Sequence, residues 1–356
     1  MFLKTSHRGF YEAKIFYFIM KLFRLVVDVP ESRHKLDYQI PSLWMGSCFT
    51  ENIGSRLKQL KFPSEVNPFG VLYNPESIRN SIYILTEKRL FTEKDLNYGN
   101  DLWYSFYHHS SFSHPDRVMC LVKINDRILK ASSLFKNADF LFITFGTARA
   151  YRKKDDGKVV SNCHKLPHKN FSQVLLSVNE IVDSYINIIN HLRDFNPGLK
   201  LVFTISPVRH WKDGATGNQV SKSTLMLAIA KLVETFDHVS YFPAYEIIMD
   251  ELRDYRFYAD DMLHISNQGV DYIWKKFTAS FLGPASLPLV KEITSIKQGI
   301  EHRPFNPSTE KHRLFLRALL DRIAAFEMSV PSADFSAEKV RIFSKLENSD
   351  DINSFV

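Results

Sequence analysis

Short apolar runs that end at glycine, proline or polar residues alternate along this chain with amphipathic stretches of helical length. Strands of a parallel sheet that is covered on both faces have this character, because both of their sides are buried. The runs are "LWMG" at 43–46, "FLFITFG" at 140–146, "KLVFTISP" at 200–207 and "HVSYFPA" at 238–244, and the helical patterns occupy 48–60, 172–197 and 221–236. The alternation predicts a three-layer α/β/α sandwich around a mostly parallel five-stranded sheet, with functional groups at the carboxyl ends of the strands.

The 356 residues, 45% of them hydrophobic, are sufficient for one large domain, which we expect at residues 20–285. Residues 84–130 do not fit a strand–helix unit and are expected to be an insertion or lid, and residues 286–356 a helical C-terminal extension. Residues 1–19 are interpreted as an upstream extension before Met20. The apolar run there is interrupted by Lys21 and Arg24, no small-residue cleavage site follows, and no uncharged stretch is long enough to span a bilayer.

The net charge of +7 is spread among acidic residues without a dense basic run, so we expect neither a nucleic-acid nor a membrane partner. The three cysteines, Cys48, Cys120 and Cys163, leave one unpaired in any disulfide scheme. This count argues against a stapled secreted scaffold and favours a reducing, cytoplasmic compartment.

A possible nucleophile follows the first apolar run. A strand that runs through Gly46 directly into a helix places Ser47 on a tight corner, close to the N–H groups of the helix start. These N–H groups, those of Ser47 and Cys48 among them, would also stabilise an oxyanion. The alternative is that Ser47 only caps the helix.

A possible acid-base pair lies in "YADDMLHISNQG" at 258–269. Asp261 and His264 are three residues apart, so one turn can bring the carboxylate to the imidazole and leave the other ring nitrogen for a nucleophile. Asp-x-x-His alone is a weak pattern. Its place after the last strand and before a helix capped by Ser266 makes it a candidate.

Six motifs then occur in order: "GSCF" at 46–49, "NPFGVLYNP" at 67–75, "TFGTARAY" at 144–151, "NCHKLPHKNF" at 162–171, "SPVRH" at 206–210 and "DDMLHIS" at 260–266. Together they resemble the GSCFA-domain family, a bacterial group similar to the SGNH (GDSL-like) hydrolases. The resemblance covers nearly the whole chain from about Met20. It implies a flavodoxin-like sandwich and Ser-His-Asp ester chemistry without a cofactor, with Ser47 as nucleophile, Asp261 and His264 as the acid-base pair, and Gly70 as an oxyanion donor.

One departure from the SGNH pattern concerns the oxyanion hole. In that pattern a Gly-x-Asn-Asp asparagine donates to the oxyanion, whereas the matching strand end here reads "FGTARAY" and contains no asparagine. Losing such a donor costs ~3 kcal/mol of transition-state stabilisation. Thr147 or Asn162 could replace it, and the sequence does not choose between them.

Other residues offer rival or additional chemistry. Cys48 could attack an acyl group instead of Ser47, although its place on the first helical turn favours a buried thiol. His108, His109, His114, Cys163, His164 and His168 are zinc-ligand types, but no metal-binding spacing is present and we predict no metal. The possible substrate-binding residues are Asn67, Gly146, His164, Arg209 and His210, the last two suited to an anionic or sugar-like group.

These observations predict a serine-dependent acyl-ester hydrolase of the esterase or deacetylase type, with possible acyl transfer on a carbohydrate and a small-molecule or glycan ester as substrate. A non-catalytic binding module on the same fold is the alternative, since the oxyanion asparagine is missing. The substrate, the acceptor and the oligomeric state are left open.

Overall fold

The computed structural model describes residues 24–351, with the side chains of 348–351 left out, so the predicted extension at 1–19 lies outside the described residues. Its centre is a five-stranded sheet in the order β10-β9-β5-β1-β2, in which every neighbouring pair is parallel. The strands are β1 (Ser42–Gly46), β2 (Ser64–Val66), β5 (Phe140–Phe145), β9 (Lys200–Ile205) and β10 (Val239–Tyr241). The order is that of a flavodoxin-like sheet, which confirms the predicted fold class.

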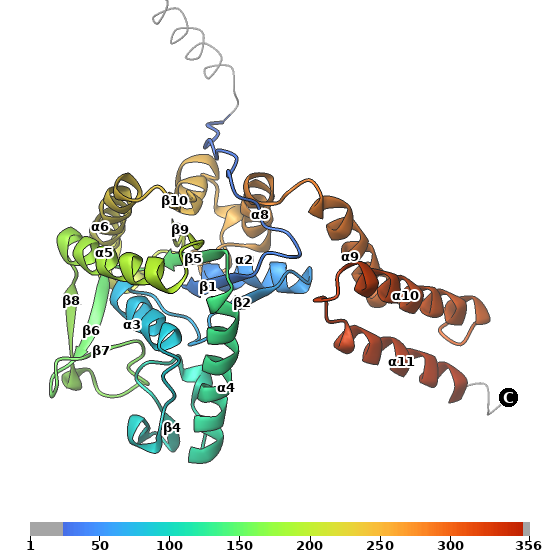
Figure 1. Cartoon of the computed structure of the whole chain (residues 1–356), viewed down its shortest axis with the longest axis horizontal. Helices are drawn as coiled ribbons and strands as arrows, with labels where there is room; N and C mark the ends of the chain where they lie inside the picture. The colour runs from blue at the N-terminus through green and yellow to red at the C-terminus, as the bar shows by residue number, and fades with distance from the viewer. Residues whose placement is uncertain (1–23, 352–356) are drawn as a thin grey trace, which may run out of the picture.

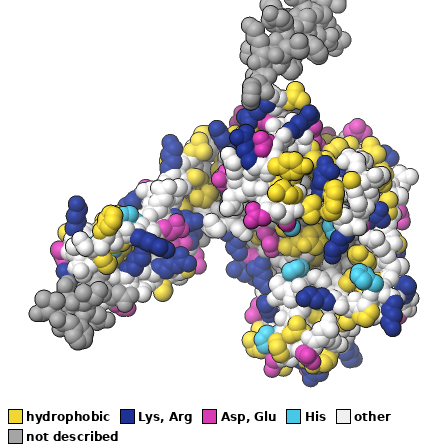
Figure 2. Space-filling model, turned by 180° about the vertical axis from the view of Figure 1, so that it is seen from behind, with side chains coloured by type: hydrophobic (Ala, Val, Ile, Leu, Met, Phe, Trp, Pro, Cys, Tyr) yellow, Lys and Arg dark blue, Asp and Glu magenta, His cyan; other side chains and the backbone are white. Residues whose placement is uncertain are grey.

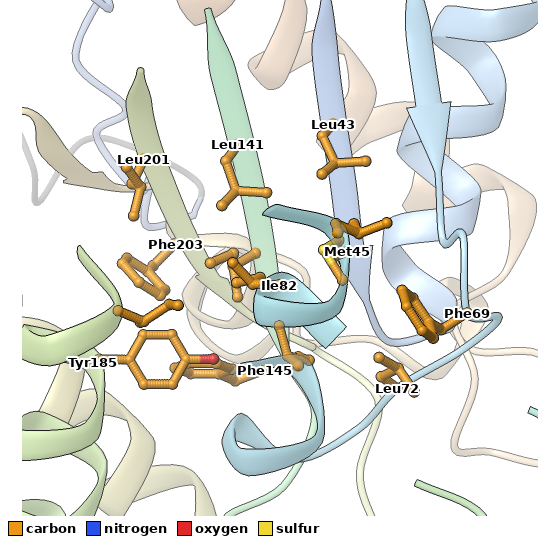
Figure 3. Close-up of a cluster of buried hydrophobic side chains, with 14 of the residues drawn as sticks. Leu43, Met45, Phe69, Leu72, Ile82, Leu141, Phe145, Tyr185, Leu201 and Phe203 are labelled. Carbon is orange, nitrogen blue, oxygen red and sulfur yellow. The ribbon is translucent and has the colours of Figure 1, made fainter. Parts of the chain in front are cut away.

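The strands bury both of their faces, as the apolar runs predict. On one face, Leu43 and Met45 of β1 join Leu141 and Phe203 in a core that Ile82 and other residues of the covering helices complete (Figure 3). These helices are α3 (Pro75–Thr86), α4 (Arg117–Lys136), α5 (Val178–Phe195) and α6 (Gly214–Thr235). On the other face, α2 (Cys48–Gln59) and α8 (Asn267–Phe281) pack in a second core.

That second core contains an aromatic stack. The ring of Trp44, which points to the opposite side of β1 from Leu43, lies parallel to the ring of Phe142 with 3.8 Å between centroids, and Phe277 of α8 meets both edge-on. Successive side chains of a strand point to opposite faces, so one short run supplies both cores.

Two sequence-based boundaries are wrong. Residues 117–130 are not part of an insertion, because they form most of α4, the crossover helix before β5. The insertion is the segment between α3 and α4, with a short hairpin of β3 (Asn97–Gly99) and β4 (Leu102–Tyr104).

The helix expected at 172–197 starts later, because its first residues form β8 (Phe171–Leu175). This strand pairs with β6 (Arg149–Lys153), whose other edge holds β7 (Val159–Val160). A capping box of Ser177 and Glu180 then starts α5. The apolar spacing alone did not separate this strand from the helix that follows it.

The C-terminal residues form the expected helices, α9 (Ser286–Glu301), α10 (Glu310–Ser329) and α11 (Ser336–Asp351), which extend to one side of the sandwich (Figure 1). They remain attached to it through Tyr38, whose ring stacks on Phe62 and meets Phe326 of α10 edge-on. Lys61 adds a salt bridge of 2.7 Å to Glu338 of α11.

On the face shown in Figure 2, Lys and Arg side chains are interspersed with acidic and neutral surface and form no continuous basic track. In the described part of the chain, no helix combines the length and the apolar character needed to cross a membrane.

Candidate active site

The corner between β1 and α2 depends on Gly46. Its φ is 141°, and a Cβ at this position would lie 2.2 Å from the carbonyl oxygen of Thr144 on β5. Only glycine lets the two strands approach this closely while the chain turns into a helix. Ser47 follows as the N-cap of α2, with its Oγ accepting the N–H of Phe49 at 3.3 Å.

This corner lies where the strand order of the sheet reverses. From β1 the chain moves outward to β2 and then returns to β5 on the other side of β1, so the carboxyl ends of β1 and β5 flank the switch point. Ser47 follows β1 and Gly146 follows β5. In open α/β sheets, ligands bind at this place.

Asp261 and His264 form the predicted pair. The Nδ1 of His264 lies 2.5 Å from Oδ2 of Asp261, and the backbone N–H of His264 donates to Oδ1 at 2.8 Å. The hydrogen bonds from the His264 side chain and then from the backbone lower the pKa of Asp261 to about 2, so the carboxylate is charged at neutral pH. The Nε2 of His264 has no partner among the described residues, and both side chains are about half exposed.

The pair and the serine are not hydrogen-bonded to each other in the described structure. Ser47 is only 1% exposed, whereas Asp261 lines an open cavity of about 640 Å³. For these three residues to act in catalysis, His264 must therefore come within hydrogen-bond distance of Ser47. A path from the solvent to Ser47 must also open.

Most of the expected oxyanion donors already have acceptors. The N–H of Ser47 donates to Thr144 at 3.3 Å, that of Gly70 to Asn67 at 2.8 Å and that of Thr147 to Tyr73 at 2.9 Å. The hydroxyl of Thr147 lies 2.9 Å from that of Ser221.

The other proposed replacement, Asn162, lies in the loop between β7 and β8. Its Oδ1 accepts the N–H of His164 at 2.8 Å. His164 is buried and stacks on Tyr104 of the insertion, with its Nε2 at 3.0 Å from the carbonyl of Ser105. Among the described residues no hydrogen bond joins Asn162 or His164 to Ser47, and the contacts of His164 attach the loop to the insertion.

Two donors remain unused beside the corner. The N–H of Cys48, in the first turn of α2, has no oxygen acceptor among the described residues, as is usual for a helix start. The second is Nδ2 of Asn67, which is buried without a partner while Oδ1 of the same amide accepts the N–H of Gly46 at 2.9 Å. An asparagine amide without a partner therefore lies after β2, whereas the strand end after β5 has no asparagine.

The Cys48 thiol is half-buried. Burial first, and then the charge of Glu51, raises its pKa, although nearby backbone N–H groups and Lys222 act in the opposite direction. A thiol with a raised pKa is a weak source of thiolate at neutral pH. This environment favours Ser47 over Cys48 as nucleophile.

A second His–Asp pair follows β9. The Nδ1 of His210 lies 3.2 Å from Oδ2 of Asp213, which also forms a salt bridge of 3.3 Å with Arg149. The ring of His210 lies 6.4 Å from that of Tyr73, whose carbonyl holds Gly146 at the switch point. Asp213 was not predicted from the sequence, although it is three residues from His210, as Asp261 is from His264.

Lys222 of α6, which is 1% exposed, was not predicted from the sequence either. Its Nζ donates to the carbonyls of Gly146 and Ser206 at 2.7 and 2.6 Å, so it links the ends of β5 and β9. Burial lowers its pKa to about 7. A lysine within a helical pattern ordinarily indicates a solvated face, so no local signal marks it as buried.

Among the described residues, no three His, Cys, Asp or Glu side chains are grouped as metal ligands. His108 of the insertion lies instead in an aromatic cluster, with its ring stacked on Phe69 and burial lowering its pKa to about 3.

The family model described as "GSCFA family" matches residues 41–277, which contain Ser47, Asp261 and His264. The chain belongs to the GSCFA family. A second model, "GSCFA domain protein, C-terminal domain", matches residues 293–348, so the helices α9 to α11 are a recognised part of GSCFA proteins. None of the curated proteins matches the chain in sequence.

Two solved structures resemble this GSCFA chain distantly. A carbohydrate esterase of family 3 from Talaromyces cellulolyticus is 10% identical over 71% of this chain and 99% of that chain, with a TM-score of 0.33. An acetyl xylan esterase from the rumen bacterium Butyrivibrio proteoclasticus is 12% identical over 70% of this chain and 64% of that chain, also with a TM-score of 0.33. Likenesses at this level carry no argument about activity.

Proposed function

We propose that this GSCFA protein is a serine-dependent acyl-ester hydrolase or acyltransferase. The observation that carries the proposal is the hydrogen bond of 2.5 Å between Asp261 and His264, which leaves Nε2 of the imidazole free as a base. The position of Ser47 at the switch point of the sheet supports the same chemistry.

In the proposed reaction, Oγ of Ser47 attacks the carbonyl carbon of the ester and its proton moves to Nε2 of His264. Asp261 balances the imidazolium charge, and free donors at the corner receive the oxyanion of the tetrahedral intermediate. The intermediate collapses, the alcohol leaves with the proton from His264, and an acyl-serine remains. Water or a second hydroxyl then releases the acyl group by the same steps, and Ser47 recovers its proton.

A binding module without catalysis is the second candidate, because the Ser47 hydroxyl is buried and is not bonded to His264 in the described structure. Labelling by a fluorophosphonate probe, which requires an activated serine, separates the two. We expect wild-type protein to be labelled at Ser47 and to turn over p-nitrophenyl acetate.

The matched variants are Ser47→Ala and Cys48→Ala. The first should lose labelling and turnover, and the second should retain most of both, because the Cys48 thiol is protonated at neutral pH. An active Ser47→Ala beside an inactive Cys48→Ala would refute the assignment of the nucleophile. Absence of labelling in the folded wild-type chain would favour the binding module.

A further inference from the structure

A cavity of about 640 Å³ lies beside the turn that carries Asp261. The loop after β9 lines it with Arg209 and Trp211, and the segment before α8 lines it with Tyr255, Tyr258 and Asp261. The loop and the segment are far apart in sequence, and a ligand held between them would lie next to the proposed acid-base pair.

With one exception, each charged side chain that lines this cavity has an ionisable partner among the described residues. Asp261 is bound to His264 at 2.5 Å, and Asp254 has Arg256 at 3.7 Å. Arg253 has Asp250 at 3.1 Å. Arg209 is the exception, since no carboxylate among the described residues lies within salt-bridge distance of it.

Arg209 is half-buried, and among the described residues its one hydrogen bond runs from Nη2 to the thioether sulfur of Met249 at 3.3 Å. A guanidinium carries five N–H donors in a fixed fork that matches a carboxylate or phosphate, and a thioether is a weak acceptor. Most of the donor capacity of Arg209 is therefore unused inside a cavity that can hold a ligand.

A second basic side chain, Lys222 of α6, interacts electrostatically with Arg209, although it does not line the cavity. Nζ of Lys222 donates to the carbonyls of Gly146 and Ser206, and burial first and then the charge of Arg209 lower its pKa. An anion bound to Arg209 would reduce the electrostatic repulsion between Arg209 and Lys222. Cys48 interacts electrostatically with Lys222, and Glu51 of α2 interacts with Cys48. Glu51 is exposed and does not line the cavity, so it does not balance the charge of Arg209 there.

Aromatic side chains form part of the remaining lining, together with Ile248, Met249, Met262 and Leu263. Trp211 is 53% exposed and Tyr255 is 76% exposed, although both line the cavity. Exposed aromatic rings beside a polar anchor suit a ligand with a flat apolar face, such as a sugar ring.

We propose that this cavity is an anion-binding subsite, in which Arg209 receives a carboxylate or phosphate on a sugar-like portion of the ester substrate. The assignment of this anion to an ester substrate rests on the proposed function. The binding of the anion does not, and it is tested separately from turnover.

The test is calorimetric titration of the full-length wild-type chain with glucuronate, glucose 6-phosphate, inorganic phosphate and glucose at constant ionic strength. We expect at least one of the three anions to bind measurably and more tightly than glucose. Binding of glucuronate alone would identify a substrate with a carboxylate, and binding of glucose 6-phosphate alone a substrate with a phosphate. If inorganic phosphate binds as tightly as glucose 6-phosphate, the site recognises the anion and not the sugar. All three results support the subsite.

Arg209→Gln removes the charge and most of the fork, and we expect it to weaken binding of the anion by about 10- to 100-fold. Arg253→Gln is the matched control, because Arg253 lines the same cavity but is exposed and already paired, and its effect should stay below about threefold. Anion binding no tighter than that of glucose, or an unchanged affinity in Arg209→Gln, overturns the subsite. If the wild-type chain binds the anion but is not labelled at Ser47, the proposed function is refuted and the anion-binding subsite is still supported.

Discussion

The side-chain oxygen of Asn67 accepts the backbone N–H of Gly46 at 2.9 Å, and this bond fixes an unused amide donor next to Ser47. Asn67 has a φ of 45°, a conformation that asparagine tolerates better than most residues. We propose that this donor forms its hydrogen bond only when charge develops on the substrate.

Replacement of Asn67 by aspartate tests this role. Asn67→Asp keeps an acceptor for the N–H of Gly46 and removes the donor, so kcat should fall by about 10²- to 10³-fold with little change in KM. Steady-state kinetics on p-nitrophenyl acetate, with thermal unfolding to verify the fold, measure the effect.

Asn162→Ala and Thr147→Val are the comparison variants, since the structure gives both side chains partners away from Ser47. Both should retain near wild-type kcat. If Asn162→Ala loses much of its kcat while Asn67→Asp stays active, Asn162 and not Asn67 is the oxyanion donor.

The two His–Asp pairs make different predictions about the general base. If His264 is the base, kcat/KM of the wild type should rise with pH through one ionisation, and His264→Ala should remove both the rate and this dependence. Asp261→Asn should fold and lose a large part of the rate, because an amide cannot balance the imidazolium charge. Its neighbour Asp260 is exposed, and the His264 ring bonds to Asp261 instead, so Asp260→Asn should stay active.

His210→Ala distinguishes the pairs. The bond of 3.2 Å between His210 and Asp213 is longer than that of the other pair, and Asp213 is shared with Arg149. We therefore expect His210→Ala to raise KM more than it lowers kcat. If His264→Ala keeps the pH dependence of kcat/KM and His210→Ala loses it, His210 is the general base.

The sandwich was predictable because its strands are buried on both faces. Such strands consist of continuous apolar runs, which are visible in the sequence. Ser47 and the pair of Asp261 and His264 were predictable for a related reason, since each depends on a few adjacent residues at one corner or one turn. The structure confirms these local arrangements and leaves their roles as predictions.

What the sequence did not reveal depends on contacts between distant elements. The start of β8 was missed because strand pairing with β6, not local spacing, decides its conformation. Asn67 and Lys222 were not recognised as donors at the corner and at the strand ends because their burial and partners come from other strands. Arg209 was placed at a pocket, but the lack of a carboxylate partner becomes visible only when the surrounding charges are assembled.

Lys222 gives a prediction about stability. Burial lowers its pKa from 10.5, the ordinary value for a lysine, to about 7 in the folded chain, so between these pH values the unfolded chain binds one proton more at this residue than the folded chain. Unfolding then takes up a proton, and raising the pH makes unfolding less favourable. The contribution of Lys222 to the free energy of unfolding should therefore rise with pH through this window and level off above it.

Urea denaturation of wild type and Lys222→Met at intervals from pH 6 to pH 10.5 measures this contribution, because other titrating groups cancel in the difference. The difference in free energy of unfolding should shift in favour of the wild type as pH rises, with a slope approaching about 1.4 kcal/mol per pH unit in the middle of the window. Lys231→Met is the matched control, since Lys231 lies exposed on the same helix, and its difference from wild type should stay constant. A constant difference for Lys222→Met as well would mean that the buried ammonium keeps its proton in the folded chain, stabilised by the carbonyls of Gly146 and Ser206 against the cost of burial.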